Sequence, residues 1–460
     1  MLWVLERRLN ARYSSEHTRS YVMRLRVLLS FVAFVSVGSY VRLPAEPKAQ
    51  LNEPPTGFSA LFNGKDLSGW YGLKTFDPYK LKAMDSAQRN AKLAEGMKSL
   101  KEHWSVEDGV LINDGHGDYM TSKKEFGDIE LFVDYRTVPK ADSGIYLRGC
   151  PQVQIWDHTN EAVHKLGADK GSGGLWNNAG GAAGKDPLVL ADKPFGEWNR
   201  FRILQVGERT TVYLNGQLVV EDAVMDNYFD RSRPLYPRGS IQLQTHGGKI
   251  EWRNIFVREI LPGEANAFLS RAPMRPIFNG NDLSGWAGEV DSYEVVEGAI
   301  QCKSGKGGTV YFNEVLSDFV VRFEFQLSPG GNNGLAIRFD GGKGDPAYDA
   351  MCELQVLDNT SPNYAALDSR QYHGSAYGMV PAHRGYLRPV GEWNFQQVTV
   401  VGSTVKVELN GTTILRADLS QVTKFMDDTA HPGKDRRSGF FGFAGHGDPV
   451  RFRAIALMRL

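Results

Sequence analysis

The side chains that could carry chemistry recur in two matched sets along this chain of 460 residues. His246 and His446 each stand before a glycine and a final strand, and a neutral imidazole can act as a base or as a metal ligand. Glu353 could also act as a base or a ligand. Gln152, at the matching place, can bind a hydroxyl group but cannot accept a proton. These residue types predict acid–base chemistry on a polar ligand; the alternatives are turn-bridging histidines and a solvent-facing carboxylate.

Charged residues on the neighbouring predicted strands are further candidates. Arg148 and Arg338 each have a fixed charge and five donors, so they could hold a developing negative charge or a leaving oxygen. The alternative for both is an ion pair with a nearby acid. Asp157 and Asp358 end their strands, where they could bind a metal ion or ligand hydroxyls, or could form turns.

Amide and aromatic side chains are the candidates for ligand contact. A glutamine at an alternating strand position with apolar neighbours faces away from the core, toward a groove. An aromatic ring offers a broad apolar face on which a ligand can stack. Gly-rich runs precede Trp176 and Tyr377 and indicate a loop over that groove. The predicted substrate-binding residues are Gln152, Gln154, Trp156, Trp176, Gln244, Gln355 and Tyr377.

Sequence motifs repeat in the same order in both halves of the chain. Residues 61–70, Leu-Phe-Asn-Gly-Lys-Asp-Leu-Ser-Gly-Trp, return at 277–286 as Ile-Phe-Asn-Gly-Asn-Asp-Leu-Ser-Gly-Trp. A match over roughly 190 residues indicates a domain duplication, because a solenoid repeats every 20–50 residues. Other repeated motifs are Gly-Glu-Trp-Asn at 196–199 and 391–394, and Leu-Asn-Gly at 214–216 and 409–411. We therefore expect a first domain at 57–260, a linker at 261–276 and a second domain at 277–460.

The local pattern in both halves is that of short strands. Residues 128–136 and 318–326 alternate between apolar and polar types, which places one face of each strand on a core. The Asn-Gly pairs supply the positive φ angles of two-residue hairpin turns. Residues 79–103 are rich in helix formers and predict a helix inserted in the first domain only. The pattern predicts an all-β fold, with two jelly-roll sandwiches in tandem.

Composition narrows the function classes. The chain has 53 basic and 53 acidic residues and no basic stripe, which argues against a nucleic-acid partner. Its three cysteines include no CxxC pair, which argues against a zinc ribbon. Cys302 and Cys352 could form a disulfide or remain free thiols, and the sequence leaves this open.

The N-terminus has the pattern of an export signal. Basic residues after Met23 precede an apolar run of eleven residues, Val27 to Val37, which is too short to favour a membrane-spanning helix. We expect residues 1–22 to be an extension, or to lie before a true start at Met23. Residues 23–39 are then a signal peptide and residues 40–56 a Pro-rich linker. The mature protein is expected in the periplasm or outside the cell, without a stable membrane span; an uncleaved anchor is the alternative.

Six motifs in order, present twice, resemble one family. They are the Phe-Asn-Gly-x-Asp-Leu-x-Gly-Trp opening, the (Asp/Asn)-(Ser/Asn)-Gly…Arg strand, the (Glu/Gln)-x-Gln-x-x-Asp strand, Gly-Glu-Trp-Asn, Leu-Asn-Gly and the closing His-Gly. The family is that of 3-keto-disaccharide hydrolases, also described as 3-keto-glucoside 1,2-lyases and 3-keto-2-hydroxyglucal hydratases. The resemblance implies a concanavalin A-like fold for each copy.

The resemblance also implies a reaction. A ketone at C3 of a glucosyl ring acidifies the C2 hydrogen, so a base can start a β-elimination that expels the oxygen at C1. Addition of water to the 2-hydroxyglucal then completes a net hydrolysis. Such a site needs a base, an acid and a positive group for the enolate, and a divalent metal cation could supply the positive charge. The implied catalytic residues are His246, Glu353, His446, Arg148 and Arg338, with Asp157 and Asp358 as metal ligands. An upstream oxidoreductase that makes the 3-keto sugar is the implied partner.

Each copy departs from the family pattern at one polar position. The first copy has Gln152 where glutamate is common, and the second has Ala444 where the first keeps Gln244. The active copy is therefore open, and a non-catalytic tandem carbohydrate-binding protein is the alternative. The Glu-x-Asp-x-x-Glu run of glucanases with this fold is missing from the sequence, which argues against ordinary glycoside hydrolysis.

Overall fold

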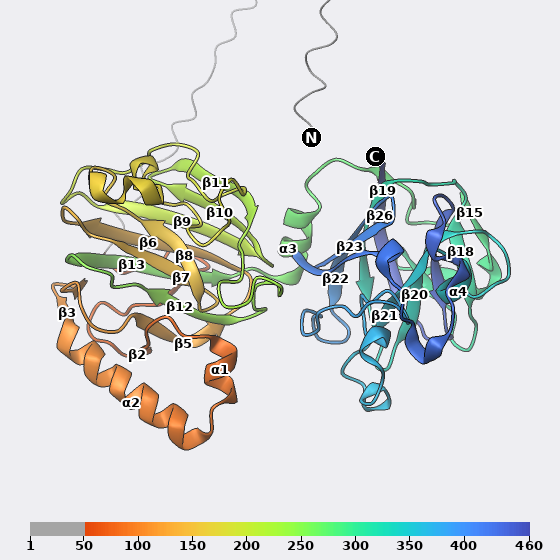
Figure 1. The fold of residues 1–460 in the computed structure, drawn as a ribbon, viewed down its shortest axis with the longest axis horizontal. Helices are drawn as coiled ribbons and strands as arrows, with labels where there is room; N and C mark the ends of the chain where they lie inside the picture. Colours follow the sequence, from red (N-terminus) through yellow and green to blue (C-terminus); the bar gives the residue numbers. More distant parts are fainter. Residues whose placement is uncertain (1–50) are drawn as a thin grey trace, which may run out of the picture. The chain divides into compact units, whose positions relative to one another are not determined.

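The computed structural model describes residues 51–460, which form two successive β-sandwiches (Figure 1). The predicted extension at 1–22, the signal peptide at 23–39 and most of the first linker lie outside the described residues. The prediction of an all-β chain with two tandem sandwiches is confirmed. Among residues 51–460, no helix is long and apolar enough to cross a lipid bilayer.

The first sandwich pairs an eight-stranded sheet with a five-stranded sheet. The large sheet has the order β11-β10-β9-β6-β13-β4-β3, with β1 paired to β13, and the small sheet has the order β2-β5-β12-β7-β8. The large sheet comprises β1 (Ser59–Ala60), β3 (Trp104–Glu107), β4 (Val110–Asn113), β6 (Ile129–Thr137), β9 (Asn199–Val206), β10 (Arg209–Leu214), β11 (Gln217–Val224) and β13 (Ile250–Glu259). The small sheet comprises β2 (Trp70–Gly72), β5 (Met120–Phe126), β7 (Ser143–Leu147), β8 (Cys150–Ile155) and β12 (Gly239–Leu243).

The second sandwich repeats this topology. Its large sheet has the order β16-β17-β26-β19-β22-β23-β24, with β14 paired to β26, and its small sheet has the order β15-β18-β25-β20-β21. The large sheet comprises β14 (Arg275–Pro276), β16 (Tyr293–Val296), β17 (Ala299–Cys302), β19 (Phe319–Gln326), β22 (Trp393–Val401), β23 (Thr404–Leu409), β24 (Thr412–Asp418) and β26 (Arg451–Arg459). The small sheet comprises β15 (Trp286–Gly288), β18 (Gly308–Phe312), β20 (Asn332–Phe339), β21 (Cys352–Leu357) and β25 (Phe440–Gly445).

Strand alternation separates the core from the polar faces. On β6, Leu131 and Val133 pack in the core of the first sandwich, whereas Glu130 and Asp134 bind arginines on the opposite face. On β21, Leu354 and Val356 lie in the core of the second sandwich. The intervening residues of β21 therefore face outward from the small sheet, which is the face that carries the candidate site.

The repeated motifs hold turns and hairpins. Asn63 accepts hydrogen bonds from the N–H groups of Lys65 and Asp66, and Asn279 forms the equivalent turn in the second copy. Asn215 has a φ of 53° and Gly216 a φ of 82°, the left-handed conformation that the hairpin turn requires. These motifs are therefore structural, and they identify the scaffold rather than the chemistry.

The insertion predicted at 79–103 contains two helices, α1 (Pro78–Ala83) and α2 (Ser86–His103). The single predicted helix is interrupted because Met84 is extended and Asp85 caps α2 by accepting the N–H of Gln88 at 2.8 Å. Figure 1 shows the pair beside β2 and β5. Helix α2 approaches β2 closely, since a Cβ on Gly72 would lie 2.0 Å from the carbonyl oxygen of Gly96.

The remaining helices are short. The predicted linker at 261–276 contains helix α3 (Pro262–Leu269), and α4 (Pro346–Asp349) lies between β20 and β21. Cys302 and Cys352 are buried free thiols. The 3₁₀ helices are Glu161–Leu166, Ala168–Lys170, Val290–Ser292, Pro362–Tyr364, Ser369–Gln371, Leu419–Gln421, Met426–Asp428 and Pro432–Asp435.

Candidate functional site

A buried glutamate and a histidine meet on the outer face of the small sheet in the second copy. Glu353 lies on β21, and His446 directly follows β25. The Nε2 atom of His446 lies 3.5 Å from Oε1 of Glu353. The Glu353 side chain is 4% exposed and that of His446 46% exposed. The pair therefore joins a desolvated carboxylate to an imidazole that solvent can reach.

A glycine on the intervening strand makes this contact possible. Strand β20 lies between β21 and β25, and Glu353 crosses it at Gly334. A Cβ at Gly334 would lie 1.8 Å from Oε1 of Glu353 and 2.5 Å from its Cγ. Any larger residue at this position would displace the carboxylate.

The pair has shifted proton affinities. Burial raises the pKa of Glu353, and the hydrogen bond and charge of His446 offset only part of that shift. The hydrogen bond with Glu353 raises the pKa of His446 by more than burial lowers it. A buried carboxyl group with a raised pKa next to an imidazole is suited to take up a proton and return it.

A cavity of ≈690 Å³ adjoins the pair. Its walls come from Gly288 and Glu289, from residues 307–309, from the loop 341–346 and from residues 444–446. Among the described residues that line it, none is Phe, Tyr or Trp, and the ionisable side chains are those of Glu289, Lys343, Asp345, Glu353 and His446. The cavity therefore offers backbone groups and charges to a polar ligand.

In the first copy, the matching histidine has a different carboxylate partner. His246 Nδ1 lies 2.6 Å from Oδ2 of Asp142, and this hydrogen bond raises the pKa of His246. Gln154 donates to Asp142 at 2.7 Å, and Gln152 donates to Gln154. The side chain of His246 is 61% exposed.

The two copies thus exchange an amide and a carboxylate. Asp142 of the first copy corresponds to Asn332 of the second, and Gln152 corresponds to Glu353. Asn332 accepts a hydrogen bond of 2.9 Å from Gln355, as Asp142 does from Gln154. The carboxylate beside the histidine therefore comes from β21 in the second copy and from the residue before β7 in the first.

The predicted amides lie on the expected face. Gln152, Gln154 and Gln355 are buried on the outer face of their small sheets. Gln152 donates to Gln154, Gln154 donates to Asp142 just before β7, and Gln355 donates to Asn332, the first residue of β20. Gln244 follows β12 on the same face and donates to the hydroxyl of Tyr146 at 3.5 Å. The structure therefore brings Gln152, Gln154 and Gln244 to the same face as His246.

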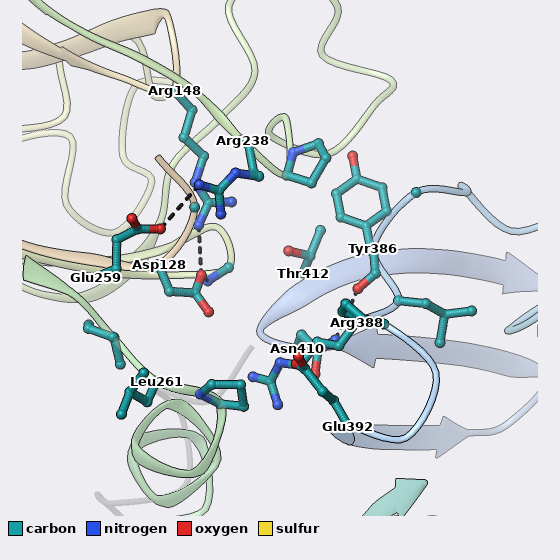
Figure 2. Close-up of a pocket in the computed structure, with 18 residues that line it drawn as sticks. Asp128, Arg148, Arg238, Glu259, Leu261, Tyr386, Arg388, Glu392, Asn410 and Thr412 are labelled. Atoms are coloured by element: carbon teal, nitrogen blue, oxygen red, sulfur yellow. Dashed lines mark hydrogen bonds and ion pairs between the residues drawn. The ribbon is translucent and has the colours of Figure 1, made fainter. Parts of the chain in front are cut away.

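The structure does not bring the predicted arginines to the histidines. Arg148 follows β7, six residues beyond Asp142, which corresponds to about 20 Å along a strand. Its guanidinium donates to Asp128 at 2.8 Å, and Figure 2 shows this ion pair near that between Arg238 and Glu259. Arg338 is 1% exposed and donates to Asp318 and to the carbonyl groups of Ser317, Gly402 and Arg436. Both arginines hold the loops at the far end of the sheet.

The predicted metal ligands form turns. Asp157 accepts hydrogen bonds from Thr159 and from the N–H of Lys140, and Asp358 accepts them from Thr360 and from the N–H of Gly330. Burial acts to raise the pKa of Asp157, but these hydrogen bonds outweigh it and leave the pKa below its usual value. Within residues 51–460, no group of three or more His, Cys, Asp or Glu side chains is arranged to hold a metal ion. The donor sets at Asp157 and Asp358 therefore do not fit a metal site.

The predicted aromatic residues lie outside the cavity lining. Trp156 is 8% exposed. The ammonium of Lys185 lies 5.2 Å from the ring centroid of Trp176, and Tyr377 accepts a hydrogen bond from Gln371. Trp156 and Trp176 belong to the first copy, and Tyr377 of the second copy does not line the Glu353 cavity.

Sequence reasoning missed Gly334 as a positioning residue and the loop 341–346 as a wall of the cavity. The loop could have been found by comparing the spacing of equivalent residues in the two copies. Glu353 follows Arg338 by 15 positions, whereas Gln152 follows Arg148 by four. An alignment of the two halves would therefore have revealed an insertion next to the candidate base.

Comparison with known proteins gives matches in both halves of the chain. A family model described as a 3-keto-alpha-glucoside-1,2-lyase-like domain matches residues 57–258 and 273–458. A 3-keto-disaccharide hydrolase of Bacteroides thetaiotaomicron is 29% identical over 235 residues, which cover 42% of this chain and 79% of that protein. A presumed glycosyl hydrolase of Parabacteroides distasonis is 21% identical with a TM-score of 0.37, and the match covers 41% of this chain and 100% of that one. A carbohydrate-binding module of Bacillus subtilis is 16% identical with a TM-score of 0.25, and the match covers 38% of this chain and 94% of that one.

Proposed function

Because this chain belongs to the 3-keto-alpha-glucoside-1,2-lyase-like family, we propose that it cleaves glycosidic bonds of 3-keto sugars and that its second copy carries the chemistry. The pairing of buried Glu353 with His446 beside a polar cavity is the observation that carries this proposal. The Bacteroides relative, named as a 3-keto-disaccharide hydrolase, supports the substrate class.

In the elimination step, Glu353 acts as the base and His446 as the acid. The ionised carboxylate takes the proton from C2 of the 3-keto ring, and the C1–O bond breaks as the C1=C2 double bond forms. The protonated imidazole gives its proton to the departing oxygen. The step leaves a neutral carboxyl group, a neutral imidazole, the unsaturated keto sugar and an alcohol.

The hydration step reverses both proton transfers. Water adds to C1 while neutral His446 accepts its proton, and the carboxyl group of Glu353 returns a proton to C2. The raised pKa of Glu353 favours this role, because the carboxyl group must keep the proton until it is returned to C2. A carboxyl group of ordinary pKa would lose that proton to solvent at neutral pH. The pair is thereby restored, and the net change is hydrolysis of the glycosidic bond.

The alternative of a carbohydrate-binding role is favoured by one observation, and only for the first copy. Its outer face carries hydrogen-bonded amides, and the histidine there pairs with a more exposed carboxylate, Asp142. We propose a binding or structural role for this copy.

Export, metal assistance and a partner oxidoreductase are further parts of the proposal. Export rests on the sequence pattern at residues 23–39. The oxidoreductase follows from the chemistry, because the C3 ketone must be made before the C2 proton becomes acidic. Metal assistance rests on the need for positive charge at the enolate, and no residue is assigned to it.

The test is turnover of a glucoside oxidised at C3, compared with its unoxidised parent. Wild-type protein is expected to cleave only the oxidised substrate. Glu353→Gln and His446→Gln are expected to abolish turnover, whereas His246→Ala is expected to retain it. Activity that survives Glu353→Gln would contradict the assignment, and cleavage of the unoxidised parent would contradict the elimination. Treatment with a chelator, followed by addition of a divalent cation, tests metal assistance separately.

A further inference from the structure

The two copies differ in how much space their side chains leave beside the histidine. We propose that Thr309 and Ala444 set the size of substrate that the second copy accepts, by leaving room beside Glu353 for the sugar beyond the scissile bond. This inference rests on the proposed function and adds to it the residues that select the leaving group.

The strand register identifies the equivalent positions in the two copies. Thr309 on β18 pairs with Ala444 on β25. In the first copy, Met120 pairs with Leu243, so that the next residues along, Tyr119 and Gln244, occupy the same places. The second copy therefore has a hydroxyl-bearing side chain and a methyl group where the first copy has a phenol and a long amide.

In the first copy, large side chains fill the equivalent space. Tyr119, Tyr146 and Gln244 are all buried, and the rings of Tyr119 and Tyr146 lie 5.6 Å apart. Gln244 donates to the hydroxyl of Tyr146, which also bonds Thr75 at 2.8 Å. Helix α2 packs on the adjacent strand at Gly72. Side chains of the protein thus occupy the place that a second sugar ring would need.

In the second copy, the same region is open. Thr309 and Ala444 line the cavity of ≈690 Å³ together with Glu353 and His446. Gly288, the equivalent of Gly72, also lines this cavity instead of contacting a helix. This volume lies in the middle of the roughly 300–1,000 Å³ over which pockets enclose drug-sized ligands. It leaves room for a leaving sugar as well as the 3-keto ring.

The lining also matches a hydroxylated leaving group. Most of the residues that line it are glycines or polar or charged residues, and Lys343 and Asp345 come from the loop that only the second copy has. Backbone groups and charged side chains can bind several hydroxyl groups, whereas an apolar aglycone would leave them unpaired. The geometry therefore favours a disaccharide over an aryl glucoside.

The test transfers residues of the first copy into the second. Thr309→Tyr, Ala444→Gln and the double variant are compared with wild type on two substrates, a glucose disaccharide oxidised at C3 of one ring and methyl 3-keto-glucoside. We expect kcat/KM for the disaccharide to fall roughly tenfold or more relative to that for the methyl glycoside. The matched control, Tyr119→Thr in the first copy, should leave this ratio unchanged.

Three outcomes would overturn the inference: an unchanged ratio in the double variant, equal losses on both substrates, or a change of the ratio in the first-copy control. Equilibrium binding of the unoxidised disaccharide and of methyl glucoside is measured on the same proteins. If wild type cleaves neither substrate, the proposed function fails. A selective loss of disaccharide binding in the double variant would still support the size selection, and its absence would refute it.

Discussion

The substitution Glu353→Gln separates the chemistry of the second copy from its fold. Glutamine keeps the size and shape of the side chain but cannot take up a proton. The first copy already has Gln152 at the equivalent position, on the same strand of the same topology. The scaffold therefore accommodates the amide, and we expect the variant to fold.

The expected loss of activity follows from the role of a general base. Removal of such a group typically lowers a rate by about 10²- to 10⁴-fold, which corresponds to about 2.7 to 5.4 kcal/mol of activation free energy. The hydrogen bond between His446 and Glu353 is long, at 3.5 Å, and therefore weak, so its loss cannot account for a change of this size. A kcat reduced by at least two orders of magnitude would therefore report lost proton transfer.

The same variant should change how stability depends on pH. Burial raises the pKa of Glu353, so the fold favours its neutral form. That contribution to the free energy of unfolding is complete below the ordinary pKa of a glutamate and is lost as the pH rises through the folded-state pKa. His446, whose pKa the hydrogen bond to Glu353 raises, loses its contribution in the same direction. A tenfold difference in proton affinity between the folded and unfolded states corresponds to about 1.36 kcal/mol.

The measurement is urea denaturation of both proteins from pH 4 to pH 8, alongside kcat on a 3-keto glucoside. Glu353→Gln should be close to wild type in stability at the acidic end and more stable than wild type at the alkaline end. The reciprocal variant Gln152→Glu is the control for the strand position. A variant that keeps wild-type kcat, or that loses stability as the pH rises more steeply than wild type, would refute this reasoning.

Three further variants test positions around the two sites. Gly334→Ala should lower kcat roughly tenfold to a hundredfold at an unchanged melting temperature, because its Cβ would displace the carboxylate of Glu353; wild-type kcat would contradict that placement. Asp142→Asn should lower the pKa of His246, as followed by an NMR titration of the ring, and should leave turnover intact; a large loss of turnover would assign the chemistry to the first copy. Arg338→Met should lower the free energy of unfolding by about 1–3 kcal/mol in urea denaturation, since it removes the donor of the carbonyl groups of Ser317 and Gly402; an unchanged midpoint would show that the arginine does not hold the loops.

The fold could be predicted because its signals are local. Alternation along residues 128–136 and the Asn-Gly turns at 215–216 and 410–411 report strands and hairpins directly, and the repeat made each half a check on the other. The helical insertion was predicted less completely. The break between the two helices depends on the extended backbone of Met84 and on Asp85, which caps α2. The high content of helix-forming residues across 79–103 does not reveal it.

The site was predicted by residue type and not by position in space. Glu353 and His446 were both identified as candidates, but their contact depends on a neighbouring strand that carries Gly334 at the crossing point. Arg148 and Arg338 were predicted beside the histidines, but they lie at the other end of the sheet. Arg148 follows β7 and Arg338 lies on β20, and both strands run beside the strand that leads to the histidine. The two ends of such a strand are far apart, and the charge of an arginine does not tell which end lies near the ligand.

One scaffold can place a carboxylate beside the histidine from either of two adjacent strands. In both copies a glycine, Gly144 or Gly334, lies under the side chain that crosses from the outer strand. Where that side chain is Glu353, the carboxylate is 4% exposed, whereas Asp142, before the inner strand, is 25% exposed. Because burial is what raises the pKa of Glu353, the crossing strand is the position that can hold a proton-transferring carboxyl group. The amide in the first copy keeps the geometry of the crossing and removes that capacity, which is why the proposed function assigns the chemistry to the second copy.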